Sequence, residues 1–135
     1  MASPNTYGIQ KLPDGPITLY TATRDAHLRV LALSNQALRD VLDAQSDPVI
    51  HIADMRAAQL SFQDMITLAA NAAWGQNALF RHPMIREVLI VTRDEVLCLT
   101  AQSLTSDSYG TIPIRLFSNL SEALAYARSQ FARAR

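Results

Sequence analysis

Apolar and polar positions follow two different periods along the chain. Short apolar runs rich in β-branched residues predict strands at 17–22, 49–54, 88–91 and 112–117. Between and after them, apolar residues recur every three or four positions, which predicts helices at 28–42, 61–80, 94–104 and 120–131. A weakly alternating segment, 7–12, precedes the turn-forming sequence Pro13-Asp14-Gly15-Pro16. It therefore predicts an antiparallel hairpin with the first of these strands.

This order of elements predicts a fold class. Strands that alternate with helices pair in parallel through right-handed crossovers. The order ββαβαβαβα therefore indicates an α/β fold, with one mixed, mostly parallel sheet of about five strands and four helices. We expect residues 1–135 to form a single domain, long enough to bury roughly two-thirds of the surface that the unfolded chain exposes.

Charged residues stand where three of the predicted strands end. Arg24 follows the strand at 17–22, Asp54 and Arg56 end the next, and Arg93 and Asp94 follow the strand after that. The carboxyl ends of parallel strands meet at one edge of a sheet, where ligands commonly bind. These five side chains are therefore candidates to line a cleft for a small anionic ligand.

The long helix after the third strand begins with a capping pattern, in which Asp64 follows Ser61 by three residues. Several apolar residues at helical spacing are expected to face the sheet: Phe62, Met65, Ile66, Ala69, Ala72 and Ala73. A phosphate on Ser61 would meet free backbone N–H groups and the positive end of the helix dipole. Ser61 is thus a candidate phospho-acceptor, and the alternative is that its hydroxyl only caps the helix.

Large apolar residues gather towards the end of the same helix. Trp74, Leu79, Phe80 and Met84 could form a surface for another protein or for a second copy of this chain. Alternatively, they cover the edge of the sheet. Trp74 and Phe80 are our candidate partner residues, and a homodimer is one of the assemblies this surface would allow.

Composition excludes several classes of function. Twelve basic and 12 acidic residues leave no net charge, so the field that would attract nucleic acid or an anionic membrane is absent. The sequence contains no apolar run of roughly 20 residues and no signal-peptide pattern, so we expect a cytoplasmic protein that does not span a membrane. The single cysteine and the three histidines lack metal-ligand spacing, which predicts neither a metal nor another cofactor.

Two catalytic arrangements can be drawn, and the residue pattern opposes both. Asp25, Asp54 and Asp94 could form the magnesium pocket of a receiver domain, but such a domain needs a lysine where this chain has 117–119, Phe-Ser-Asn. We expect these acids to cap helices or to pair with neighbouring arginines. A triad of His51, Ser61 and Asp54 lacks the Gly-x-Ser-x-Gly elbow. The sequence therefore does not predict an enzyme.

Three segments carry a resemblance to a known family: PVIHIADMR, HPMIREVLIVT and IRLFSNLSEALAYARSQ. With the order of elements, they resemble the STAS domain (sulfate transporter and anti-sigma-factor antagonist), in particular its SpoIIAA-like soluble branch in bacteria. The resemblance implies a signalling module in which a serine or threonine after the third strand is phosphorylated. The matching position is near Ser61, within Gln59-Leu60-Ser61-Phe62-Gln63 rather than the family's usual Asp-Ser-Ser/Thr-Gly.

Two functional hypotheses result. The first is a non-enzymatic interaction module that presents the segment from Asp54 to Ser61 and the first turn of the following helix to a protein partner. The second is a sensor of a small anionic ligand that uses the cleft at the carboxyl ends of the strands.

Overall fold

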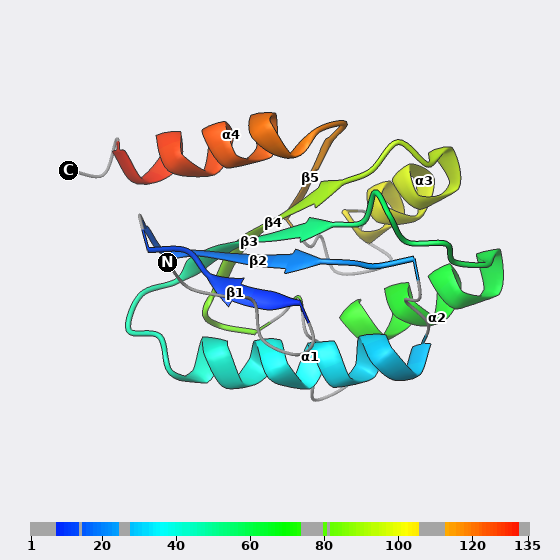
Figure 1. Ribbon diagram of the computed structural model, residues 1–135, viewed down its shortest axis with the longest axis horizontal. Helices are drawn as coiled ribbons and strands as arrows, with labels where there is room; N and C mark the ends of the chain where they lie inside the picture. The colour runs from blue at the N-terminus through cyan, green and yellow to red at the C-terminus, as the bar shows by residue number, and fades with distance from the viewer. Residues whose placement is uncertain are drawn as a thin grey trace.

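The structure is a computed structural model that describes residues 8–13, 15–24, 28–73, 80, 82–105 and 113–132. The strands in this part of the chain are β1 (Ile9–Lys11), β2 (Ile17–Thr21), β3 (Val49–Asp54), β4 (Ile85–Val91) and β5 (Ile114–Phe117). The helices are α1 (Leu28–Asp43), α2 (Phe62–Ala73), α3 (Glu95–Leu104) and α4 (Leu120–Ala132) (Figure 1).

The strands form one sheet in the order β1-β2-β3-β4-β5. The β1 strand is antiparallel to β2, and all other neighbours are parallel, so the predicted α/β fold class is confirmed. The register aligns the ends of four strands, because Thr21 pairs with Asp54, Asp54 with Val91, and Val91 with Phe117. The loops that follow these strands therefore leave the sheet along one edge.

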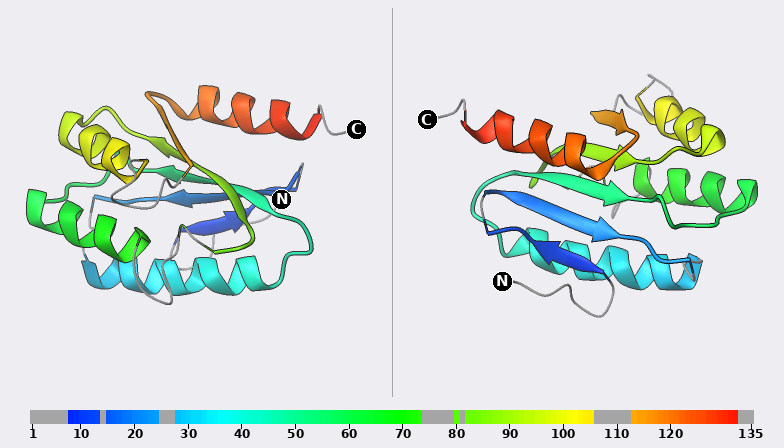
Figure 2. Two further views of the ribbon diagram at one scale, coloured as in Figure 1. Left: turned by 180° about the vertical axis from the view of Figure 1, so that it is seen from behind. Right: turned by 45° about the horizontal axis from the view of Figure 1, so that its top comes forward.

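Side chains from the two faces of the sheet form two separate cores. Ile50 and Ile52 pack on the face that α4 covers through Ala123 and Ala127. On the opposite face, alternate residues of the strands pack against α1 and α3: Ile9, Tyr20, Val49, Ala53, Val88 and Ile90. Figure 2 shows α4 on one side of the sheet and α1 on the other. Because β3 is covered on both faces, it reads as a nearly continuous apolar run.

The fourth strand begins earlier than its apolar run, at Ile85 rather than at residue 88. Pairing of Val49 with Ile85 extends it, although Glu87 is charged. Arg115 Nε donates to Glu87 Oε2 at 2.7 Å, and the Tyr126 hydroxyl donates to Glu87 Oε1 at 2.8 Å. These two bonds satisfy the carboxylate, so the charge does not end the strand.

The predicted inward face of α2 is wrong at Phe62, which is 65% exposed, and at Ile66, which is 50% exposed, whereas Met65 is buried. The reason is that α2 packs mainly against α3 near the carboxyl ends of the strands, rather than over the sheet (Figure 1). Its apolar stripe is therefore only partly covered. The side chains of Ala69, Ala72 and Ala73 lie outside the part of the structure that is described.

The predicted partner residues have different outcomes. Phe80 and Met84 are partly buried against the core on the α1 side of the sheet, which favours the alternative that they cover the sheet. Trp74, Leu79 and Asp25 lie outside the described residues.

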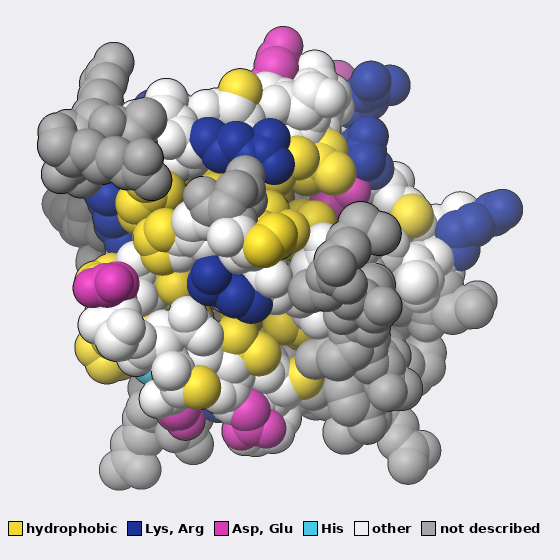
Figure 3. Space-filling model, turned by 60° about the vertical axis from the view of Figure 1, so that its left-hand side comes forward, with side chains coloured by type: hydrophobic (Ala, Val, Ile, Leu, Met, Phe, Trp, Pro, Cys, Tyr) yellow, Lys and Arg dark blue, Asp and Glu magenta, His cyan; other side chains and the backbone are white. Residues whose placement is uncertain are grey.

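On the face shown in Figure 3, basic side chains lie among apolar ones, and most of the acidic side chains lie nearer the margins. Within the described residues, no helix combines the length and the apolar composition needed to cross a membrane.

Candidate functional site

An ion pair marks the carboxyl end of β3. Arg56 donates from Nε to Asp54 Oδ1 at 2.9 Å, from Nη2 to Oδ2 at 2.8 Å, and from its backbone N to Oδ1 at 3.2 Å. Burial alone would raise the pKa of Asp54, but the hydrogen bonds and charge of Arg56 outweigh it and hold that pKa below its ordinary value. Asp54 is therefore a carboxylate that is only 5% exposed and already has a cation as its partner.

The turn after β4 is held by side-chain hydrogen bonds. Asp94 N donates to the buried Thr92 hydroxyl at 3.1 Å. Asp94 Oδ1 accepts hydrogen bonds from Val96 N at 2.8 Å and from Leu97 N at 3.0 Å, so Asp94 is the N-cap of α3, as the sequence predicted. Arg93 Nε donates to the carbonyl oxygen of Ser118 at 3.2 Å, which links this turn to the end of β5.

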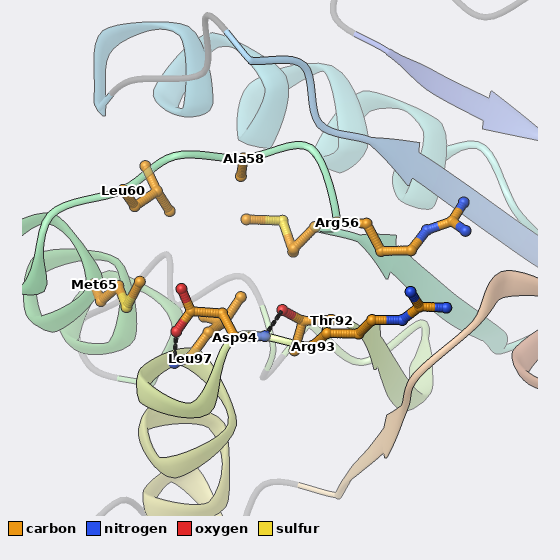
Figure 4. Close-up of a pocket in the computed structure, with 9 residues that line it drawn as sticks. Arg56, Ala58, Leu60, Met65, Thr92, Arg93, Asp94 and Leu97 are labelled. Carbon is orange, nitrogen blue, oxygen red and sulfur yellow. Dashed lines mark hydrogen bonds between the residues drawn. The ribbon is translucent and has the colours of Figure 1, made fainter.

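A pocket of about 270 Å³ lies between these two turns and the beginning of α2 (Figure 4). We call it the strand-end pocket, and it is lined by Met55, Arg56, Ala58, Leu60, Met65, Thr92, Arg93, Asp94 and Leu97. The β3–α2 loop, residues 55–61, forms one wall, and the β4–α3 turn with the first turn of α3 forms the other. The site therefore depends on two crossovers that the parallel sheet places side by side.

The two ends of the strand-end pocket differ in chemistry. In Figure 4, Leu60, Met65 and Leu97 surround one end, whereas the side chains of Arg56 and Arg93 extend away from them towards the other. The Asp94 carboxylate lies next to Met65 and Leu97 in this view, where it accepts hydrogen bonds from the amino end of α3. One end of the pocket is thus apolar apart from Asp94, and the other end is basic.

The sequence identified part of this site. Arg56, Arg93 and Asp94 line the pocket as expected, whereas Asp54 lies next to it as the partner of Arg56. Arg24 is exposed and is not among the lining residues. Sequence reasoning missed the apolar lining: Met55, Ala58, Leu60, Met65 and Leu97. The available signal was the apolar composition of the β3–α2 loop, which is unusual for an exposed connection.

Ser61 caps α2, because its hydroxyl accepts a hydrogen bond from Asp64 N at 3.1 Å and its carbonyl accepts one from Met65 N at 3.0 Å. The predicted cap is confirmed. The hydroxyl is exposed, and its neighbour Leu60 lines the strand-end pocket. Phosphorylation of Ser61 remains a prediction.

The described residues do not assemble a catalytic triad. His51 is buried, and its Nδ1 lies 2.9 Å from the hydroxyl of Thr18 on the neighbouring strand. Burial lowers the pKa of His51 to about 4, so the ring is neutral at pH 7. Asp54 pairs with Arg56 and Ser61 caps a helix, so all three residues are engaged elsewhere. Nor does any cluster of three or more His, Cys, Asp or Glu residues able to hold a metal ion occur in the described ranges.

The comparison with solved structures supports the fold. No protein-family model matches the sequence, and neither does any curated protein. The structure is similar to that of an uncharacterized DUF3478-family protein from Shewanella loihica PV-4, which is described as having a SpoIIAA-like fold. The TM-score is 0.58 over 89% of this chain and 90% of that chain, with 14% sequence identity. The SpoIIAA-like fold that the sequence predicted is therefore confirmed.

Proposed function

We propose that this chain is a single-domain, non-enzymatic regulatory module of the bacterial cytoplasm. It binds a protein partner through the β3–α2 loop and the first two turns of α2. The observation that supports this most directly is the exposure of Phe62 and Ile66, at 65% and 50%, immediately after Ser61. Large apolar side chains that remain in water next to each other are typical of interaction sites.

The exposed apolar residues share a helix face. Phe62 and Ile66 are four residues apart, so they lie on the same side of α2. The neighbouring helix α3 adds Val96 and Leu99, which are 41% and 64% exposed and three residues apart. Since α2 and α3 pack against each other, a partner that spans both helices would cover both pairs. Apolar contacts of this kind supply most of the free energy in the centre of an interface.

Ser61 provides a means of regulating such contacts. A phosphate on its exposed hydroxyl would add a charge of about −2 beside Phe62 and would be stabilised by the N-terminus of α2. Ser61→Asp should therefore alter partner binding with little loss of stability, because aspartate is also a good N-cap.

Site-specific photo-crosslinking tests this proposal. A photoreactive amino acid replacing Phe62 should give a discrete protein adduct in a lysate of the native host, and one replacing the exposed Ser121 on α4 should not. The captured protein, once purified, should bind the unmodified chain and lose affinity for the double variant Phe62→Ser, Ile66→Ser. An adduct made only of two copies of this chain would indicate a homodimer. Equal labelling from positions 62 and 121 would contradict the proposal.

The strand-end pocket supports a second candidate function, the sensing of a small anionic ligand. What favours it is the presence of two arginines, Arg56 and Arg93, beside one pocket of about 270 Å³. Arginine is well suited to binding carboxylate and phosphate groups. Arg93→Gln should then weaken the binding of an anion, as measured by calorimetry, whereas Arg39→Gln, on α1 and outside the pocket lining, should not.

A further inference from the structure

Among the described residues that line the strand-end pocket, Arg93 is the cation without an acidic partner. Arg56 is committed to Asp54 by two side-chain hydrogen bonds. Arg93 uses only Nε, which donates to the carbonyl oxygen of Ser118. Within the described part of the chain, the two terminal nitrogens of Arg93 have no hydrogen-bond partner. Its guanidinium can therefore bind an anion without breaking a contact.

The acid in the pocket lining does not cancel this charge. Asp94 accepts hydrogen bonds from Val96 N and Leu97 N, where its carboxylate interacts with the positive end of the α3 dipole. An uncommitted guanidinium matches an anion with a single charge. A polyphosphate, which carries several charges, would need more basic groups than the described lining residues supply.

A buried hydroxyl adds a second polar contact. Thr92 lines the pocket and is 5% exposed. Its oxygen accepts a hydrogen bond from Asp94 N, and among the described residues its proton has no acceptor. Thr92 can therefore donate one hydrogen bond to a bound molecule.

The rest of the lining is apolar and limits the size of the ligand. Leu60, Met65 and Leu97 form the end of the pocket away from the arginines (Figure 4), and Met55 and Ala58 complete the apolar lining; the two methionines are flexible side chains. At about 30 Å³ per water-sized atom, a volume of about 270 Å³ holds roughly nine heavy atoms. A short acyl chain or one ring system fits these limits.

We infer that the strand-end pocket binds an amphipathic monocarboxylate. Its carboxylate contacts the Arg93 guanidinium, and its apolar group of roughly six or seven carbons lies beside Met65 and Leu97. This inference rests on the ligand-sensing function and names its ligand class; it is independent of the protein-binding function.

Methionine-methyl NMR provides the test, with octanoate as the probe. Of the four methionines, Met55 and Met65 line the pocket, whereas Met84 packs elsewhere against the core and serves as an internal control. Octanoate should shift the Met55 and Met65 signals in a saturable manner and leave Met84 unchanged. Octanol, which lacks the charge, and acetate, which lacks the chain, should each bind at least about tenfold more weakly.

Variants assign the two ends of the ligand. Arg93→Gln should weaken octanoate binding about tenfold and leave octanol binding unchanged, whereas Arg39→Gln should affect neither. If inorganic phosphate or acetate binds with the same affinity as octanoate, the assignment of an amphipathic ligand is wrong, but the anion-sensing function still holds. No saturable shift with any probe would overturn both. Crosslinking from position 62 would still test the protein-binding function.

Discussion

Arg56 and Asp54 are two residues apart and form a bidentate ion pair, with nitrogen–oxygen distances of 2.9 and 2.8 Å. The backbone beneath the pair is held by both neighbouring strands, since Ala22 N donates to the Asp54 carbonyl and Met55 N donates to that of Val91, each at 2.9 Å. The pair thus stands on a rigid sheet edge, and it neutralises a nearly buried carboxylate beside the strand-end pocket.

The first prediction concerns the pH dependence of stability in Arg56→Gln. Without the guanidinium, burial of Asp54 should dominate and raise its pKa above the ordinary value of 3.8. In the wild type the folded-state pKa is depressed, so stability is present above the unfolded-state pKa and is lost as pH falls. In the variant the sign reverses, and stability should fall as pH rises above about 4. Urea denaturation of both proteins between about pH 3 and pH 6 measures the free energy of unfolding against pH. If that free energy rises with pH in the variant as it does in the wild type, the prediction is wrong.

The second prediction concerns His51. Its folded-state pKa of about 4 lies below the ordinary value of 6.5, so the unfolded state binds a proton first. The contribution of His51 to stability is therefore constant above about pH 6.5 and decreases as pH falls towards 4, by about 3 kcal/mol in total. His51→Gln should remove this part of the pH dependence. NMR titration of the ring should give a midpoint near 4, and a midpoint near 6.5 would contradict the prediction.

The third prediction concerns the cap of α2. Ser61→Ala removes the acceptor for Asp64 N and should lower the free energy of unfolding by about 1 kcal/mol, whereas Ser61→Asp should largely preserve it. Asn119→Ala is a matched control, because the Asn119 side chain accepts a hydrogen bond from Glu122 N at 2.8 Å at the start of α4. If the two alanine variants lose similar amounts of unfolding free energy, Ser61 acts as an ordinary helix cap. A Ser61→Ala protein as stable as the wild type would show that the cap contributes little.

The fourth prediction separates the two sides of α2. The double variant Phe62→Ser, Ile66→Ser should change stability by no more than about 0.5 kcal/mol per site, because both side chains are largely exposed. Met65→Ala should cost about 2 to 5 kcal/mol, because Met65 is 5% exposed. Chemical denaturation of the three proteins gives the comparison. A large loss in the double variant would mean that these residues contribute to the core.

Local patterns explain why much of the fold could be predicted. The apolar run of β3 and the capping sequences at Ser61, Asp94 and Asn119 report short-range physics that each segment carries by itself. The prediction placed the start of β4 too late, because strand pairing and the partners of Glu87 come from distant residues.

The candidate site was predicted only in part. Charges after strand ends are visible in the sequence, and Arg56, Arg93 and Asp94 do meet at the strand-end pocket. Arg24 follows a strand in the same manner but does not line the pocket. Which charges are adjacent depends on the path of each loop after it leaves the sheet, and periodicity contains no information on that path.

The sequence by itself determined the α/β class, the order of elements and the helix caps, because these depend on residues close together in the chain. Tertiary structure alone decided that Asp54 engages Arg56 while Arg93 donates to the carbonyl oxygen of Ser118, and that Phe62 and Ile66 face solvent while Met65 is buried. A helical pattern shows that an apolar stripe exists, but the neighbouring elements decide how much of it is covered. Here α2 packs on α3 beside the strand ends, so part of the stripe is left exposed next to the strand-end pocket.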